Sequence, residues 1–174
     1  MKEIMSWEIV KWIGLAVVLI FAVMALTGAP YVPSLVKELR LAFTKLYAVG
    51  KKDLVVDLGS GDGVVLKVAS ELGAKGFGVE LNPFLVLITK WRFRKNKDVR
   101  VVQGNLFKVD FPAETTVVYV FGDARDIEGM KAAIVKQAKR LGRDLWVISN
   151  GFELPGLEPK KKYRSYFLYK IAHK

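Results

Sequence analysis

The segment from Val55 to Gly63, with the sequence VVDLGSGDG, constrains the fold of this chain more than any other feature. Two β-branched residues lead into Asp57, and three glycines then alternate with other residues. Glycine lets the backbone turn sharply and approach a bound molecule where a side chain would clash. The segment predicts a buried strand ending at Asp57, a ligand-binding loop, and a helix near Asp62 whose free N–H groups face the ligand.

The spacing of these glycines separates two classes of nucleotide cofactor. Dinucleotide-binding loops favour G-x-G-x-x-G after the strand, whereas here an acid precedes G-x-G-x-G. A neighbouring carboxylate disfavours a pyrophosphate, but Asp57 can hold the ammonium at the methionyl end of S-adenosylmethionine. The loop therefore favours S-adenosylmethionine over NAD. Its predicted cofactor-binding residues are Asp57, Gly59, Ser60, Gly61, Asp62 and Gly63.

A second acid follows at the spacing expected for a nucleoside ligand. The segment GAKGFGVELN predicts another strand, which ends at Glu80, about 20 residues after the first loop glycine. A carboxylate there can accept hydrogen bonds from both ribose hydroxyls. The alternative interpretation is a glycine-rich turn beside an unrelated surface glutamate. The two acids together favour the cofactor site.

Strand and helix patterns alternate over the rest of the chain and predict an α/β fold. The expected strands are 54–58, 76–80, 99–103, 116–121 and 145–149, and the expected helices are 64–72, 83–94 and 127–141. This order is typical of a Rossmann-like, doubly wound parallel sheet with helices on both faces. A preceding helix is expected after Pro33, with Ser34 as its N-cap and Gly50 at its end. The alternating segment Tyr163–Ile171 predicts an antiparallel edge strand.

In such a sheet the ligand lies beyond the carboxyl ends of the strands. Four strand ends are therefore expected to line one site: 57–63, 80–82, 104–106 and 122–123. The cofactor contacts expected after the glycine loop are Glu80, Leu81, Asn82, Asn105 and Leu106. Methyltransferases usually place an aspartate where Asn105 stands, and the Asn105 carbonyl can still accept a hydrogen bond from the adenine amino group. Asp123 either contacts the substrate or caps the next helix.

The composition limits the nucleophiles and the metal sites that the chain can contain. The chain has no cysteine, which excludes disulfides, thiolate metal sites and cysteine nucleophiles. Its one histidine, His173, is next to the last residue. We therefore expect no metal site and a reaction that depends on the reactivity of the cofactor. The net charge of +11 permits an acidic protein, a nucleic acid or an anionic membrane as partner, without choosing among them.

An apolar segment near the N-terminus predicts a membrane anchor. Residues from Trp12 to Val36 carry no charge, and Trp12–Ala29 is almost wholly apolar. About 18 to 20 such residues cross the hydrocarbon core of a bilayer. The alternatives are a cleaved signal peptide and a core or interfacial helix. The excess of Lys and Arg after the segment predicts a single-pass membrane protein whose globular part faces the cytoplasm. We expect an anchor at 1–29 and one globular domain at 30–174.

A basic run lies in the middle of the chain. Six cations fall between Lys90 and Arg100, at the expected end of a helix. One interpretation is a solvated face that the helix dipole favours, and the other is docking on an anionic membrane or an acidic partner. The run by itself does not decide between them.

Three motifs together resemble one enzyme family. YVPS at 31–34 follows the apolar segment, DLGSGDG lies at 57–63, and ELNP lies at 80–83. From Tyr31 to about Pro159 the chain resembles the seven-strand lysine methyltransferases that act on the adenine nucleotide translocase and the ATP synthase c-ring protein. Their archaeal, broad-specificity protein lysine methyltransferase relatives are similar as well. The resemblance implies a class I S-adenosylmethionine-dependent methyltransferase domain.

The resemblance also implies roles for single residues. Asp57, Gly59, Gly61 and Glu80 bind the cofactor in this interpretation. Tyr31 and Pro33 belong to a segment that closes over it, and Tyr31 is a candidate catalytic residue. Asp123, which the resemblance does not supply, is the second candidate catalytic residue. The chain departs from the family pattern where Ser-Leu, rather than Thr-Pro, follows YVP, and where Asp123 and Arg125 follow the VFG strand.

The implied reaction is transfer of methyl from S-adenosylmethionine to lysine side chains of a protein, with a membrane-associated protein as the expected partner. Two alternatives remain open. The net charge of +11 suits a nucleic-acid methyltransferase, although the chain has FGDA at 121–124 and lacks the N-P-P-[YF] signature of N6-adenine chemistry. The other alternative is a non-catalytic, membrane-tethered module that binds S-adenosylmethionine.

Overall fold

The computed structural model describes residues 7–16, 18–19, 36–122 and 126–174. The chain divides into two units, Met1–Val32 and Pro33–Lys174, and each is described by itself. In the first unit, residues 7–16, 18 and 19 are helical and exposed. No helix among the described residues is both long and apolar enough to span a bilayer. Most of the predicted anchor, together with Tyr31, Pro33 and Ser34, lies outside the described residues, so the anchor stays a prediction.

One sheet organises the described part of the second unit, with the strand order β3-β2-β1-β4-β5-β7-β6. Its strands are β1 (Leu54–Leu58), β2 (Lys75–Glu80), β3 (Val99–Gln103), β4 (Val117–Phe121), β5 (Leu145–Asn150), β6 (Lys161–Tyr163) and β7 (Tyr166–Ile171). Strands β1 to β5 pair in parallel, and β7 pairs antiparallel with both β5 and β6. The order reverses between β1 and β4, which is where open α/β sheets bind their ligands.

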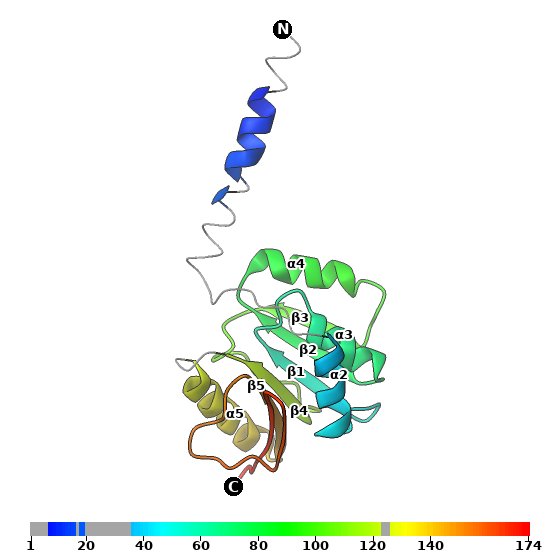
Figure 1. The fold of residues 1–174 in the computed structure, drawn as a ribbon, viewed down its shortest axis with the longest axis vertical. Coiled ribbons are helices and arrows are strands. Elements are labelled where there is room, and N and C mark those ends of the chain that lie inside the picture. Colours follow the sequence, from blue (N-terminus) through cyan, green and yellow to red (C-terminus); the bar gives the residue numbers. More distant parts are fainter. Residues whose placement is uncertain (1–6, 17, 20–35, 123–125) are drawn as a thin grey trace. The chain divides into compact units, whose positions relative to one another are not determined.

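Helices cover both faces of this sheet (Figure 1). The helices are α2 (Val36–Lys45), α3 (Val64–Glu71), α4 (Pro83–Arg92) and α5 (Ile127–Leu141). Successive side chains of a strand point to opposite faces. Val55 accordingly joins the cluster with α2 and α3, and Val56 joins the cluster with Ile134 of α5. Helix α4 packs through Val86 against Leu66 and β3, on the α3 side. The predicted parallel sheet with helices on both faces is confirmed.

The predicted antiparallel strand over Tyr163–Ile171 is confirmed as β7, but its predicted place at the edge of the sheet was wrong. The chain forms a hairpin there, in which β7 lies between β5 and β6, and β6 is the outermost strand. Arg164 takes a left-handed conformation with φ 54° in the two-residue turn between the strands. The turn residues are Arg164 and Ser165, and they are not one of the Asn-Gly or Asp-Gly pairs that signal such a turn, so the turn was not predicted.

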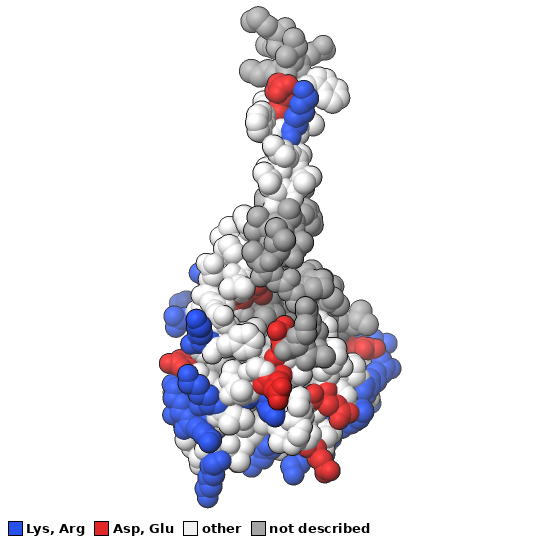
Figure 2. Space-filling view, turned by 90° about the vertical axis from the view of Figure 1, so that its left-hand side faces the viewer, with Lys and Arg blue, Asp and Glu red and all other residues white. Residues whose placement is uncertain are grey.

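Charge is mixed over the face of the second unit that Figure 2 shows. Lys and Arg side chains lie along both margins, and acidic side chains lie between them. Exposed pairs such as Lys162–Glu153, at 3.2 Å, balance part of the cationic excess. Because charges of both signs alternate, this face does not present a continuous field of one sign.

Candidate active site

The turn after β1 is built from backbone conformations that glycine adopts most readily. Gly59, Gly61 and Gly63 have φ angles of 83°, 53° and 82°. The N–H groups of Gly59 and Ser60 both donate to the Val79 carbonyl, at 2.9 and 3.0 Å, which ties the turn to β2. Gly63 then precedes the first residue of α3 as its N-cap. The loop therefore lies where the strand order of the sheet reverses, between β1 and β4, as predicted.

A carboxyl group is buried at the end of β1. Asp57 is 2% exposed, and its Oδ2 has no hydrogen-bond partner among the described residues. Burial raises the pKa of Asp57 well above its ordinary 3.8, and the negative charges of Glu80 and Asp62 raise it further. The buried Ser60 Oγ likewise has no partner in the described part of the chain. Unpaired buried polar groups are costly, and they mark this turn as a place where a ligand supplies the missing contacts.

Glu80 joins the first two strand ends. Its Oε2 accepts a hydrogen bond from the Gly61 N–H at 2.9 Å, and its Oε1 accepts one from the Asn82 N–H at 2.8 Å. The Asn82 side chain then caps α4 by accepting from the Phe84 N–H at 2.9 Å. Each Glu80 oxygen keeps a second lone pair for a ligand. The structure thus brings Asp57, the glycine loop and Glu80 together.

Side chains of helix α4 contact the glycine loop and hold its backbone. The buried Thr89 Oγ1 donates to the Gly61 carbonyl at 2.9 Å, and Arg92 forms a salt bridge of 2.9 Å with Asp62. A Cβ at Gly63 would lie 2.6 Å from the Thr89 methyl and 2.9 Å from the Phe93 ring. Thr89 was not predicted from the sequence, and Arg92 was predicted only as part of the basic run, because neither motif nor spacing indicates which loop a helix will contact.

The segment that follows β3 lies next to Glu80. The Gly104 N–H donates to the Glu80 carbonyl at 2.9 Å, which holds the segment after β3 beside the segment after β2. The exposed Asn105 uses its side-chain carbonyl to accept from the Phe107 N–H at 2.9 Å, and Leu106 packs partly against the core. The Asn105 oxygen retains one lone pair for the predicted contact with adenine.

Two aromatic side chains mark the ends of β4 and β5. Phe121 is 38% exposed and Phe152 is 37% exposed. Between them in sequence, the buried Asn150 donates to the Tyr119 hydroxyl at 3.2 Å. Sequence analysis did not single out these residues. The predicted Asp123 lies outside the described residues, so the structure does not place it.

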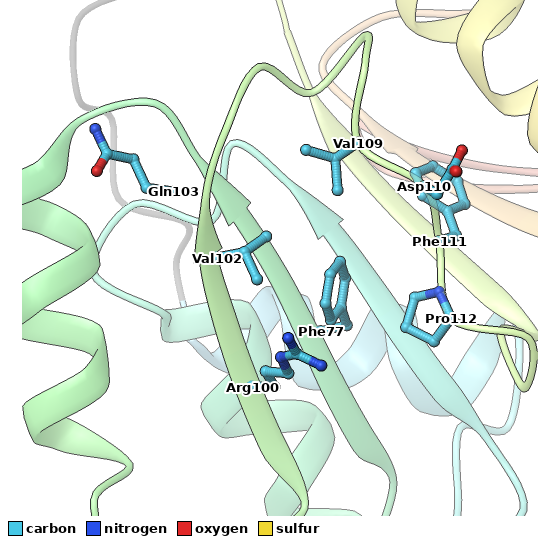
Figure 3. Close-up of a pocket in the computed structure, with 8 residues that line it drawn as sticks. All are labelled: Phe77, Arg100, Val102, Gln103, Val109, Asp110, Phe111 and Pro112. Atoms are coloured by element: carbon cyan, nitrogen blue, oxygen red, sulfur yellow. The ribbon is translucent and has the colours of Figure 1, made fainter.

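A cavity of about 400 Å³ lies elsewhere, on the face of β2 and β3 that α3 and α4 do not cover. Figure 3 shows Phe77, Arg100 and Val102 on the strands and Val109 to Pro112 on the segment that follows β3. Residues 104–116 form no helix, which leaves this face thinly covered. No residue of the glycine loop lines the cavity, so it is separate from the site at Asp57.

Comparison with known proteins identifies the family in which this site occurs. Residues 57–161 match the family described as the ANTKMT methyltransferase domain. The chain belongs to this family. A protein-lysine N-methyltransferase of Saccharolobus islandicus is 34% identical over 137 residues, covering 76% of this chain and 82% of that protein. The predicted family resemblance is therefore confirmed.

Other relatives of this ANTKMT-family chain are longer. The ATP synthase c-subunit lysine N-methyltransferase of Caenorhabditis elegans is 39% identical over 100 residues, which is 52% of each chain. The corresponding human protein is 31% identical over 134 residues, which is 75% of this chain and 54% of the human one. This chain spans about half the length of these two relatives.

A solved structure confirms the fold class. An RNA methyltransferase from Salinibacter ruber, in complex with S-adenosyl-L-homocysteine, superposes with a TM-score of 0.70 and 24% identity, covering 82% of this chain and 95% of that one. The shared fold is that of class I methyltransferases. The family and the fold together establish the chain as an S-adenosylmethionine-dependent methyltransferase.

The raised pKa of Asp57 predicts an effect on stability. Because its folded pKa exceeds its unfolded pKa, the associated stability is present at acid pH and is lost as pH rises through the folded value. We expect Asp57→Asn to raise the free energy of unfolding near neutral pH without cofactor, by more than the roughly 0.5 kcal/mol scatter of surface substitutions. Below pH 3.8 the gain disappears.

Urea denaturation at several pH values measures this effect. The exposed Asp98→Asn is the control, and its stability should follow the parent protein at every pH. A loss of stability in Asp57→Asn near neutral pH would show that Asp57 supports the fold rather than serving a ligand.

Proposed function

We propose that this chain transfers the methyl group of S-adenosylmethionine to lysine side chains of protein, and that its acceptor is a membrane-associated protein. The observation that carries the proposal is the buried, unpaired Asp57 carboxyl beside Glu80, in a chain whose relatives include protein-lysine N-methyltransferases. A buried carboxyl beside other acidic groups suits a cationic cofactor.

The residues at the first three strand ends fit the cofactor. Asp57 would pair with the ammonium of the methionyl group, and the free lone pairs of Glu80 would accept the ribose hydroxyls. The Ser60 hydroxyl would gain the partner that it lacks. Leu81, which is 53% exposed beside Glu80, and the partly buried Leu106 offer apolar surface to the adenine. Bound there, S-adenosylmethionine supplies an electrophilic methyl group.

The acceptor lysine requires an apolar path and the loss of a proton. Phe121 and Phe152 are proposed to line that path, because they expose apolar surface at the ends of β4 and β5. A lysine ammonium has a pKa of about 10.4 in water. Desolvation and a nearby cation both lower this pKa, so positioning the amine provides most of the catalysis without a histidine base. Tyr31, Pro33 and Asp123 are proposed to close the acceptor side.

A membrane location is proposed from the sequence. The segment Trp12–Ala29 is apolar enough to anchor the chain, and the following cations favour a cytoplasmic orientation of the catalytic unit. Tethering raises the effective concentration of membrane-bound targets and leaves that of soluble proteins unchanged. A lysine of a membrane-associated protein, near the cytoplasmic surface, is therefore the proposed acceptor.

Transfer of a labelled methyl group tests the reaction. Full-length protein, incubated with radiolabelled S-adenosylmethionine and a membrane fraction, should label protein, and hydrolysis should release methylated lysine. Glu80→Ala should raise the KM for the cofactor by about tenfold or more, because two hydrogen bonds to a charged group are lost. The exposed Glu128→Ala should keep the parent KM. Label in RNA or DNA, or cofactor binding without any label, would refute lysine methylation.

Extraction of membranes tests the anchor. If Trp12–Ala29 spans the bilayer, the full-length protein should stay with the membrane pellet after both high-salt and alkaline washes. Salt screens electrostatic attachment but leaves a buried apolar helix in place. Release by salt alone would show that only the basic surface holds the protein, and the anchor would be wrong.

A further inference from the structure

The outer face of α4 carries a stripe of exposed apolar side chains. Phe84, Leu87, Ile88 and Trp91 are 47%, 67%, 47% and 66% exposed, and we call them the α4 stripe. Their spacing of three and four residues places them along one side of the helix. The opposite side is buried through Val86 and Thr89. Helix α4 is therefore apolar on both its inner and its outer face.

A helix with apolar side chains on opposite faces normally has both of those faces covered. Scattered exposed apolar residues need no explanation, but four large ones in a continuous row mark an interaction surface. The row is also short, since seven residues of helix span about 10 Å. Stable dimers bury about 800 Å² on each partner, which is more than such a row offers. A second copy of this chain is thus a poor occupant for the α4 stripe.

The charge beside the α4 stripe indicates a different occupant. From Pro83 to Lys97 the chain has five cations, at Lys90, Arg92, Arg94, Lys95 and Lys97, and no acid. Arg92 is engaged by Asp62, whereas the other four side chains are exposed. The Arg94 guanidinium lies 4.4 Å from the centre of the Trp91 ring, at the junction of apolar and cationic surface. Cores of protein interfaces are depleted of lysine, whereas anionic bilayers attract it.

We propose that the α4 stripe and its cationic end dock on an anionic lipid bilayer and hold the cofactor site at the membrane surface. Trp, Phe and Leu on one side, with Lys and Arg beside them, are typical of helices that lie in the headgroup region. This proposal deepens the proposed function and rests on it for the identity of the substrate. It is independent of the predicted anchor, because the surface is formed by α4 and the residues that follow it up to Lys97.

Docking through α4 has a direct consequence for the substrate. Helix α4 begins directly after Glu80 and Asn82, and contacts the glycine loop through Thr89 and Arg92. A bilayer bound to the outer face of this helix therefore lies one helix diameter, about 10 Å, from the cofactor loop. Lysines near the membrane surface would reach the site, and lysines far from it would not.

A single fluorophore on full-length protein tests the docking. The chain has no cysteine, so Leu87→Cys provides one attachment point for an environment-sensitive dye in the α4 stripe. The control is Lys139→Cys, an exposed position on α5, on the other face of the sheet. With phosphatidylcholine vesicles that contain phosphatidylglycerol, the dye at position 87 should shift its emission to the blue and be quenched by nitroxide-labelled lipids. The dye at position 139 should stay in water.

Other outcomes would overturn the proposal. A dye at position 87 that stays in water on these vesicles contradicts docking, and equal burial on pure phosphatidylcholine contradicts the role of the cations. A blue shift in buffer without vesicles that depends on protein concentration would show that a second copy of this chain covers the α4 stripe. The same shift without concentration dependence would show that another segment of this chain covers it. A shift only with added membrane protein shows a protein partner.

Charge reversal and activity separate this proposal from the proposed function. Lys95→Glu with Lys97→Glu should weaken burial of the dye by at least about fivefold for each position, because each substitution removes a cation and adds an anion. Methyl transfer by the same labelled protein is measured in parallel. Dye burial without any transfer would overturn lysine methylation alone, whereas transfer with the dye in water would overturn docking alone.

Discussion

A buried carboxyl group at the end of the central strand, whose Oδ2 has no hydrogen-bond partner among the described residues, is the constraint on which the rest of this site depends. Asp57 lies where the strand order reverses, and both neighbouring acids add to the difficulty of ionising it. A pyrophosphate would add still more negative charge at this point. The fold therefore carries a destabilising site, and we propose that a cationic cofactor relieves it, which is the pattern expected where stability is exchanged for binding.

The shape of the loop beside Asp57 depends on a helix that contributes no group to the predicted cofactor contacts. Thr89 and Arg92 of α4 hold the carbonyl of Gly61 and the side chain of Asp62. The same helix turns its other face outward as the α4 stripe. One rigid element thus links the cofactor loop to the surface that we propose for the membrane. Such a link explains why α4 combines a buried polar hydroxyl, a paired arginine and an exposed tryptophan.

The sequence predicted the parts of the structure that follow from local backbone chemistry. The glycine loop requires left-handed conformations, and Glu80 follows it at the length of one helix and one strand. The positions of both in the fold were therefore predicted correctly. The hairpin inside the predicted edge strand was missed because its turn residues, Arg164 and Ser165, are not an Asn-Gly or Asp-Gly pair. Thr89, Phe121 and Phe152 were missed because their importance arises only when distant segments meet. The roles of Tyr31 and Asp123 stay predictions, since neither is among the described residues.

Titration of the Asp57 carboxyl tests the central claim most directly. NMR of protein with isotope-labelled aspartate carboxyl carbons, with Asp57→Asn to assign the resonance, follows its protonation with and without S-adenosylmethionine. The account predicts a pKa well above 3.8 in the free protein and a marked fall on cofactor binding, because the ammonium of the cofactor stabilises the carboxylate. An ordinary pKa in the free protein, or a raised pKa that the cofactor leaves unchanged, would contradict it.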